Sequence, residues 1–181
     1  MDITIDVENY KLNVRTAGII IHNNKVLVHR NINEDHYALI GGRIQIGENS
    51  EDALRREIQE EMGKEIQIMG NVATIENFFE MNSQKYHEIM FVHKAEFTNE
   101  EDQKIENTIQ NIEGKDYLKY EWIDLDKIEE YPLKPQIIKS ILKNGKFPVH
   151  KINIGEKEKI NNENINGNKK PGKNRRSKTS I

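Results

Sequence analysis

The chain has 181 residues, the length of one domain with a short extension, and it contains no cysteine, which excludes disulfide bonds and thiolate metal sites. The formal net charge is −3, but residues 1–150 carry 18 Lys/Arg against 27 Asp/Glu, a balance of −9. Such an acidic region argues against a broad basic face for nucleic acid.

The beginning of the chain shows no targeting segment. Residues 1–6 lack a basic region followed by an apolar stretch, so no secretory signal is visible. The longest apolar run, Ala17–Ile21, is much shorter than the about 20 residues that span a bilayer. We therefore expect a cytoplasmic protein with no membrane partner.

Strand signals dominate the first third of the chain. Asn13–His22 is predicted to be a strand, residues 22–25 a tight turn, and Val26–Val28 the partner strand of a hairpin. A short apolar run, Tyr37–Ile40, is stopped by two glycines.

A helix and further strands follow. Asn49 or Ser50 can cap a helix that runs to Met62 and ends at Gly63. We then expect long extended segments at Gln67–Phe79 and Lys85–Phe97, a polar helix-prone excursion at Asn99–Ile112, a strand at Tyr117–Ile123, and a helix at Pro135–Lys143. This order predicts an α/β (α+β) layer protein with a mixed sheet.

The composition changes near Phe147–Val149. Residues 151–181 are rich in Asn, Lys and Gly, hold few apolar residues, and carry nine Lys/Arg against three Asp/Glu. Such a segment cannot bury enough apolar surface to offset its ordering entropy. The prediction is therefore a folded domain at residues 1–150 and a disordered basic tail at residues 151–181.

The predicted helix after Asn49 carries the chemistry. At 100° per residue, Leu54, Ile58 and Met62 form an apolar stripe. Three carboxylates, Glu57, Glu60 and Glu61, occupy an adjoining sector. Carboxylates this close repel one another, and a hard divalent cation such as Mg²⁺ relieves the repulsion. The pattern favours a magnesium site.

The residues around this helix follow a known pattern, G-x5-E-x7-R-E-U-x-E-E-x-G-U, where U is a bulky aliphatic residue. Here the pattern reads Gly42, Glu48, Arg56, Glu57, Ile58, Glu60, Glu61 and Gly63, with Lys64 where an aliphatic residue is usual. This segment resembles the Nudix box. The preceding Leu39-Ile40-Gly41-Gly42 is similar to the family's L-P-G-G run, with Ile40 in place of proline.

The resemblance implies the Nudix fold, a mixed β-sheet between α-helices, and a set of residue roles. Glu57, Glu60 and Glu61 would ligate Mg²⁺, for which Mn²⁺ can substitute, and the Gly41 carbonyl would add a ligand, while Gly42 lets the backbone approach. Glu48 would bind metal or orient water. Arg56 would hold a box glutamate in place. Glu57 is the first choice of general base, and Glu88 and Glu121 outside the box are the alternatives, although an exposed or edge-strand position is favoured for Glu88.

The implied activity is hydrolysis of a phosphoanhydride bond in a nucleoside diphosphate linked to another moiety. Nucleotide sugars, ADP-ribose, nucleoside triphosphates (oxidised ones included), dinucleoside polyphosphates and capped RNA stay open as substrates. The alternatives are a nucleotide-binding regulatory module and an RNA 5′-end pyrophosphohydrolase that uses the basic tail. Isoprenoid diphosphate isomerisation is disfavoured, because those enzymes use a catalytic cysteine. Nucleic acid is otherwise not an expected partner, and a homodimer is compatible with the family.

Overall fold

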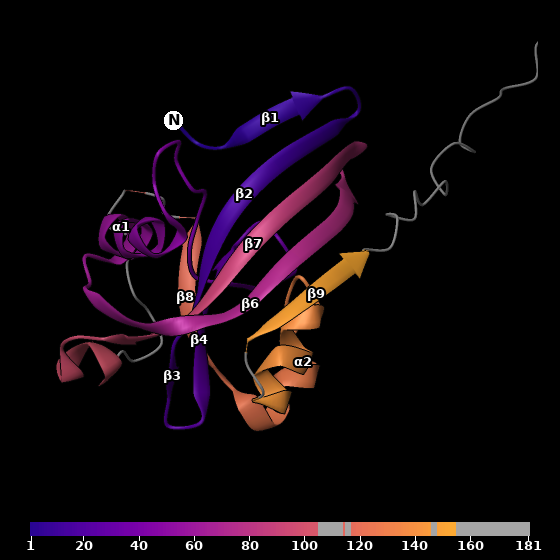
Figure 1. Cartoon of the computed structure of the whole chain (residues 1–181). Helices are drawn as coiled ribbons and strands as arrows, with labels where there is room; N and C mark the ends of the chain where they lie inside the picture. Colours follow the sequence, from indigo (N-terminus) through magenta and orange to yellow (C-terminus); the bar gives the residue numbers. More distant parts are fainter. Residues whose placement is uncertain (105–113, 115–116, 146–147, 155–181) are drawn as a thin grey trace, which may run out of the picture.

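The computed structural model describes residues 1–104, 114, 117–145 and 148–154 (Figure 1). Two sheets form its centre. The larger sheet has the strand order β1-β2-β7-β6-β9, with bounds Thr4–Val7, Tyr10–Ile19, Gln84–Phe97, Ile66–Met81 and Val149–Ile154. β2 pairs with β7 in parallel and β6 with β9 in parallel, whereas β1–β2 and β6–β7 are antiparallel.

The smaller sheet continues from the end of β2. It contains β3 (Ile21–His22), β4 (Lys25–Asn31), β5 (Ala38–Leu39) and β8 (Leu118–Asp124), with β4 in the middle. The β3–β4 hairpin confirms the predicted turn. Asn23 and Asn24 have φ values of 48° and 60°, a region that asparagine tolerates better than most residues.

Two helices cover opposite faces of the sheets. In α1 (Ser50–Met62), Leu54, Ile58 and Met62 pack in a core cluster with Ile20 and Tyr120. The side chains Ile138 and Ile141 of α2 (Ile137–Asn144) belong to a second cluster, on the side of Ala17, Met90 and Val92. Because side chains alternate along a strand, each long strand has one face toward α1 and one toward α2. We call these the α1 face and the α2 face of the five-stranded sheet.

The predicted fold class is confirmed: a mixed five-stranded sheet lies between α1 and α2. The bounds of α1 also agree with the sequence. The Asn49 side chain accepts hydrogen bonds from the amides of Glu51 and Asp52, at 3.1 and 2.9 Å. Gly63 ends the helix at φ 64°, and its amide donates to the Gln59 carbonyl at 3.0 Å.

Other elements differ from the expectation. A 3₁₀ helix occupies Glu100–Lys104 at the start of the predicted helix-prone excursion, whose residues 105–112 lie outside the described residues. A second 3₁₀ helix, Leu125–Glu130, and the strand β1 were not predicted. β9 crosses the expected domain boundary at residue 150, because Lys151–Ile154 pair with β6. The ordered sheet therefore extends to Ile154, and the predicted disorder of residues 155–181 concerns a segment outside the described residues.

This boundary predicts different outcomes for two truncations. A chain that ends at Ile154 should keep the melting temperature of the full chain, because the removed segment lacks core-forming residues. A chain that ends at Pro148 should melt about 5 °C lower or more. It loses the β6–β9 ladder and the Asn153–Asn77 side-chain hydrogen bond of 2.7 Å. Thermal unfolding of both chains measures the difference, and equal melting temperatures would show that β9 adds no stability.

Candidate active site

The loop before α1 is bound tightly to β2. The Gly18 amide donates to the Ile40 carbonyl at 2.8 Å, the Thr16 amide to the Gly42 carbonyl at 3.0 Å, and the Ile44 amide to the Val14 carbonyl at 3.0 Å. Gly41 has φ 137°, and a Cβ there would overlap the backbone of Thr16. Only glycine combines this backbone conformation with such a close approach.

Gly42 makes room for a side chain of helix α1. Its open side holds the carboxyl group of Glu57, and a Cβ at this position would overlap that carboxyl group. The Glu57 side chain is 15% exposed. The two box residues therefore fit together: the missing Cβ of Gly42 makes the place that the Glu57 carboxylate occupies.

Arg56 forms hydrogen bonds with three glutamates of the box. Its guanidinium donates to both oxygens of Glu48, at 2.8 and 2.9 Å, to Glu57 Oε1 at 2.8 Å and to Glu60 Oε2 at 3.0 Å. It also donates to the carbonyl of Arg43 at 3.0 Å, which ties helix and loop together. The hydrogen bonds from Arg56 hold the pKa of Glu48 below its ordinary value, and the bond with Glu48 is the main cause that raises the pKa of Arg56.

Glu61 lies apart from this network. Its carboxylate is buried, and Tyr120 Oη of β8 donates to it at 2.9 Å. Among the described residues, no group of three or more His, Asp or Glu side chains converges on one point as metal ligands would. The structure thus brings Glu48, Glu57 and Glu60 together through Arg56, and it places the third predicted ligand, Glu61, against Tyr120.

The residues nevertheless fit a divalent cation. Three carboxylates, Glu48, Glu57 and Glu60, contact one guanidinium, and Glu61 follows Glu60 in the helix, so negative charge is in excess. The acids come from a loop and from one side of α1, and the missing Cβ of Gly42 lets the Glu57 carboxylate lie against the backbone of the loop. Carboxylate and carbonyl oxygens are the ligands that Mg²⁺ prefers.

Glu88 occupies a different place from the one favoured by the sequence. It is buried at 3% exposure on β7, a strand inside the sheet between β2 and β6, so the expectation of an exposed or edge-strand glutamate is wrong. By alternation with Met90 and Val92 it lies on the α2 face, opposite the box helix. Its carboxylate accepts a hydrogen bond from Asn77 at 3.2 Å and lies 3.8 Å from Arg15.

Glu121, the other base candidate outside the box, belongs to a group on β4 and β8. Tyr37 Oη donates to Glu121 at 3.1 Å, and the Arg30 guanidinium lies 3.7 Å from the same carboxylate. Burial raises the pKa of Tyr37, and the neighbouring Glu121 charge raises it further. Neither this group nor the contact of Tyr120 with Glu61 has a signal in the sequence, because each joins segments far apart in the chain.

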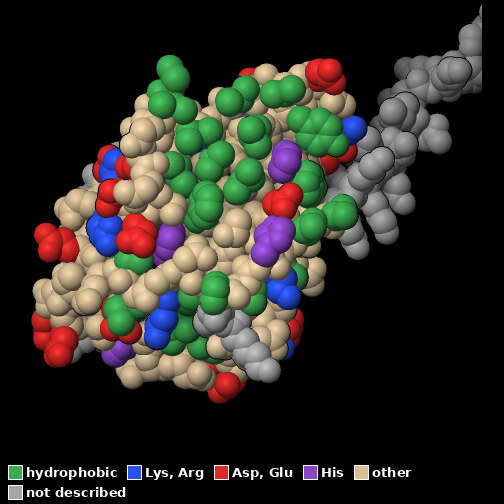
Figure 2. All heavy atoms as spheres, in the orientation of Figure 1, with side chains coloured by type: hydrophobic (Ala, Val, Ile, Leu, Met, Phe, Trp, Pro, Cys, Tyr) green, Lys and Arg blue, Asp and Glu red, His purple; other side chains and the backbone are tan. Residues whose placement is uncertain are grey.

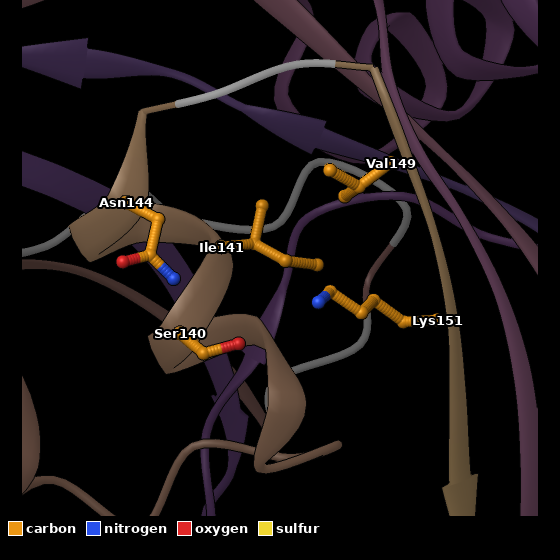
Figure 3. Close-up of a pocket in the computed structure, with 5 residues that line it drawn as sticks. All are labelled: Ser140, Ile141, Asn144, Val149 and Lys151. Carbon is orange, nitrogen blue, oxygen red and sulfur yellow. The ribbon is translucent and has the colours of Figure 1, made fainter.

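A hollow of about 350 Å³ lies between α2 and β9. Figure 3 shows Ser140, Ile141 and Asn144 of α2 facing Val149 and Lys151 of β9 across it. None of the box residues lines this hollow.

Comparisons with known proteins agree with this architecture. A structure of a MutT protein from Bacillus halodurans superposes with a TM-score of 0.55 at 19% identity, over 74% of this chain and 81% of the other. A NUDIX hydrolase from Nitrosomonas europaea superposes with a TM-score of 0.55 at 16% identity, over 78% of each chain. At these identities the likeness establishes the fold.

The sequence comparisons are more specific. The model of the NUDIX domain matches residues 12–143, so the chain belongs to the NUDIX domain family. An RNA pyrophosphohydrolase from Ruthia magnifica subsp. Calyptogena magnifica is 35% identical over 85 residues, which is 46% of this chain and 46% of that protein. The match thus spans about half the length of this relative. Within the described part of the chain, no helix is long and apolar enough to cross a membrane.

Proposed function

We propose that the protein is a Mg²⁺-dependent pyrophosphohydrolase that cleaves a phosphoanhydride bond in a nucleoside diphosphate linked to another moiety. The observation that carries the proposal is the arrangement of the complete box: Glu48, Glu57 and Glu60 around Arg56, with Gly42 shaped to the Glu57 carboxylate. A cytoplasmic location is part of the proposal, since a chain without cysteine suits a reducing compartment.

The residues have separate tasks in this reaction. Glu57, Glu60 and Glu61 would hold the cation, with the Gly41 carbonyl as a further ligand, and Mn²⁺ would substitute for Mg²⁺. When bound, the cation neutralises the diphosphate and lowers the pKa of the attacking water. Glu57, with Glu48 near it on the same guanidinium, would accept the proton of the water as the water oxygen bonds to one phosphorus. The P–O bond of the anhydride then breaks, and its bridging oxygen leaves with the second phosphate. Arg56 keeps the acids in position.

A substrate panel tests the proposal. The purified chain is incubated with nucleotide sugars, ADP-ribose, normal and oxidised nucleoside triphosphates and dinucleoside polyphosphates, with Mg²⁺ or with EDTA, and the phosphorylated products are identified. We expect hydrolysis of at least one compound with Mg²⁺, faster at alkaline pH because the water and the base must both be deprotonated. Full activity after EDTA dialysis would exclude the metal mechanism. Binding of a nucleotide without turnover would favour the regulatory module instead.

RNA with a 5′-triphosphate is a second candidate substrate. The match to an RNA pyrophosphohydrolase favours it, and the basic residues of 151–181 offer phosphate contacts that the acidic domain lacks. A short 5′-triphosphate RNA therefore belongs in the panel, with the full chain and the chain ending at Ile154. Faster turnover of the RNA than of every small nucleotide, together with a loss on truncation at low salt, would support this candidate.

A further inference from the structure

The side chain of Tyr120 is buried between the smaller sheet and helix α1. It is 1% exposed and belongs to the core cluster that contains Leu54, Ile58 and Met62 of α1. On β8 it lies opposite His29 of β4, and the centroids of the two rings are 6.1 Å apart. Because a packed helix and a paired strand hold this ring, its hydroxyl is presented at a fixed point.

The hydroxyl of Tyr120 is directed at one of the box acids. Tyr120 Oη donates to Glu61 Oε2 at 2.9 Å, and this hydrogen bond is buried. Among the three predicted cation ligands, Glu61 is buried, Glu57 is half-buried and Glu60 is exposed. Figure 2 shows acidic and basic side chains at the surface over α1, the helix at the left of Figure 1. The contact of Tyr120 with Glu61 lies beneath this surface.

A carboxylate is an expensive partner for a buried hydroxyl. A buried tyrosine hydroxyl needs a hydrogen-bond acceptor, but an amide oxygen meets this need at a lower desolvation cost than a charged carboxylate. The core therefore holds a negative charge that the packing of Tyr120 does not require. A cation at the box accounts for this charge, since carboxylates are the side chains that Mg²⁺ prefers as ligands.

The two other acids of this set are held by a charged group. Arg56 donates to Glu57 Oε1 at 2.8 Å and to Glu60 Oε2 at 3.0 Å. A guanidinium orients these carboxylates and also compensates their charge. A phenol hydroxyl orients a carboxylate by one hydrogen bond and leaves its negative charge in place. The support of Glu61 by Tyr120 thus suits an acid whose charge is to meet a cation.

We propose that Tyr120 is a positioning residue of the cation site, which fixes the orientation of Glu61 through the hydrogen bond from its hydroxyl. The proposal rests on the proposed function, because it takes Glu61 to be a ligand of the cation. Groups that donate hydrogen bonds to metal ligands orient these ligands, and the loss of such a group lowers metal affinity about 10–100-fold. In this role Tyr120 acts through Glu61 and not on the substrate.

Titration of the full, metal-free chain with Mn²⁺ tests the proposal, with the free ion measured by electron paramagnetic resonance. Tyr120→Phe removes the hydroxyl and keeps the buried ring, so the fold should persist. This substitution should raise the Kd for Mn²⁺ by about tenfold or more. Tyr37→Phe is the matched control, because it also removes a hydroxyl that donates to a glutamate, Glu121, at 3.1 Å. The control should leave the Kd unchanged.

A double-mutant cycle separates positioning from a purely structural role. In the Glu61→Gln background, Tyr120→Phe should change the Kd for Mn²⁺ by less than about threefold, because the ligand through which Tyr120 acts has already lost its charge. Tyr120→Met removes the same hydroxyl with a flexible apolar side chain and gives a second measurement. Circular dichroism confirms that each variant is folded.

Three results would overturn this proposal and leave the proposed function standing. The first is binding of Mn²⁺ by a folded Tyr120→Phe or Tyr120→Met chain as tightly as by the wild type. The second is an equal loss of affinity in Tyr37→Phe, which would show a general effect of a lost hydroxyl. The third is the same loss from Tyr120→Phe in the wild-type and Glu61→Gln backgrounds, which would assign the effect to the fold. A wild-type chain that binds no Mn²⁺ overturns the proposed function and this proposal with it.

Discussion

Replacing Glu57 by glutamine is expected to lower kcat by about a hundredfold or more, the range in which a general base contributes. Glutamine keeps the size of the side chain, so it still fits above Gly42, but the charge at this point is lost. Glu61→Gln should have a similar effect, although its carboxylate lies against Tyr120. The stability of metal-free Glu61→Gln should hold or rise, because a buried charge is removed and the glutamine oxygen can still accept from Tyr120 Oη, whereas Glu57→Gln gives up the charge of its ion pair with Arg56 and should gain nothing. The measurements are kcat, Mg²⁺ affinity by calorimetry, and the melting temperature.

Glu88→Gln is the matched control for this experiment. It makes the same chemical change at a buried glutamate on the opposite face of the sheet, so kcat should fall by less than about tenfold. A fall as steep as that of the box variants, with unchanged Mg²⁺ affinity, would instead assign the base role to Glu88. Near-normal turnover by folded Glu57→Gln and Glu61→Gln would refute the catalytic role of the box.

Gly41→Ala is expected to have the largest effect on stability, a loss of about 3 kcal/mol or more. An alanine Cβ at this position would overlap the Thr16 carbonyl oxygen, and φ 137° is strained for any residue with a side chain. The overlapping atoms belong to the backbone of β2, which cannot move away as a flexible side chain can. Urea denaturation of the variant and the wild type measures the loss.

Gly47→Ala separates the two causes of this loss. Gly47 also has a positive φ, 85°, but a Cβ there would meet nothing within 4 Å. Its substitution should cost only about 1 kcal/mol, from the strained conformation. If both variants lose the same stability, the close approach of Gly41 to β2 does not hold the loop in place.

The sequence predicts the local parts of this structure well. Helix α1 has caps that are visible as Asn49 and Gly63, and its apolar stripe and acidic sector follow from helical periodicity alone. The β3–β4 hairpin follows from the Asn23-Asn24 turn. In these elements, neighbouring residues decide the conformation.

The remaining features depend on contacts between distant segments. Three of the six residues of β9 are apolar, but the strand adjoins the polar tail, and its place in the sheet depends on its pairing with β6. Glu88 has the same neighbours in sequence whether its strand lies at the edge or inside the sheet, so its burial follows from the strand order. The contact of Glu61 with Tyr120 joins α1 to a strand that begins more than fifty residues later. No local pattern contains this information.

The Arg56 network has a consequence for how a cation enters the site. The guanidinium acts as an internal counterion, which already compensates Glu48, Glu57 and Glu60 within one set of short contacts. A cation that bound these acids would compete with Arg56 for their negative charge, so its binding free energy would be the difference between two ionic arrangements. A ligand shifts such an equilibrium only by its differential affinity. Under the proposed function, the affinity for the cation would therefore depend partly on how strongly Arg56 holds the acids, and phosphate oxygens of a bound substrate would add ligands that favour the cation-bound enzyme.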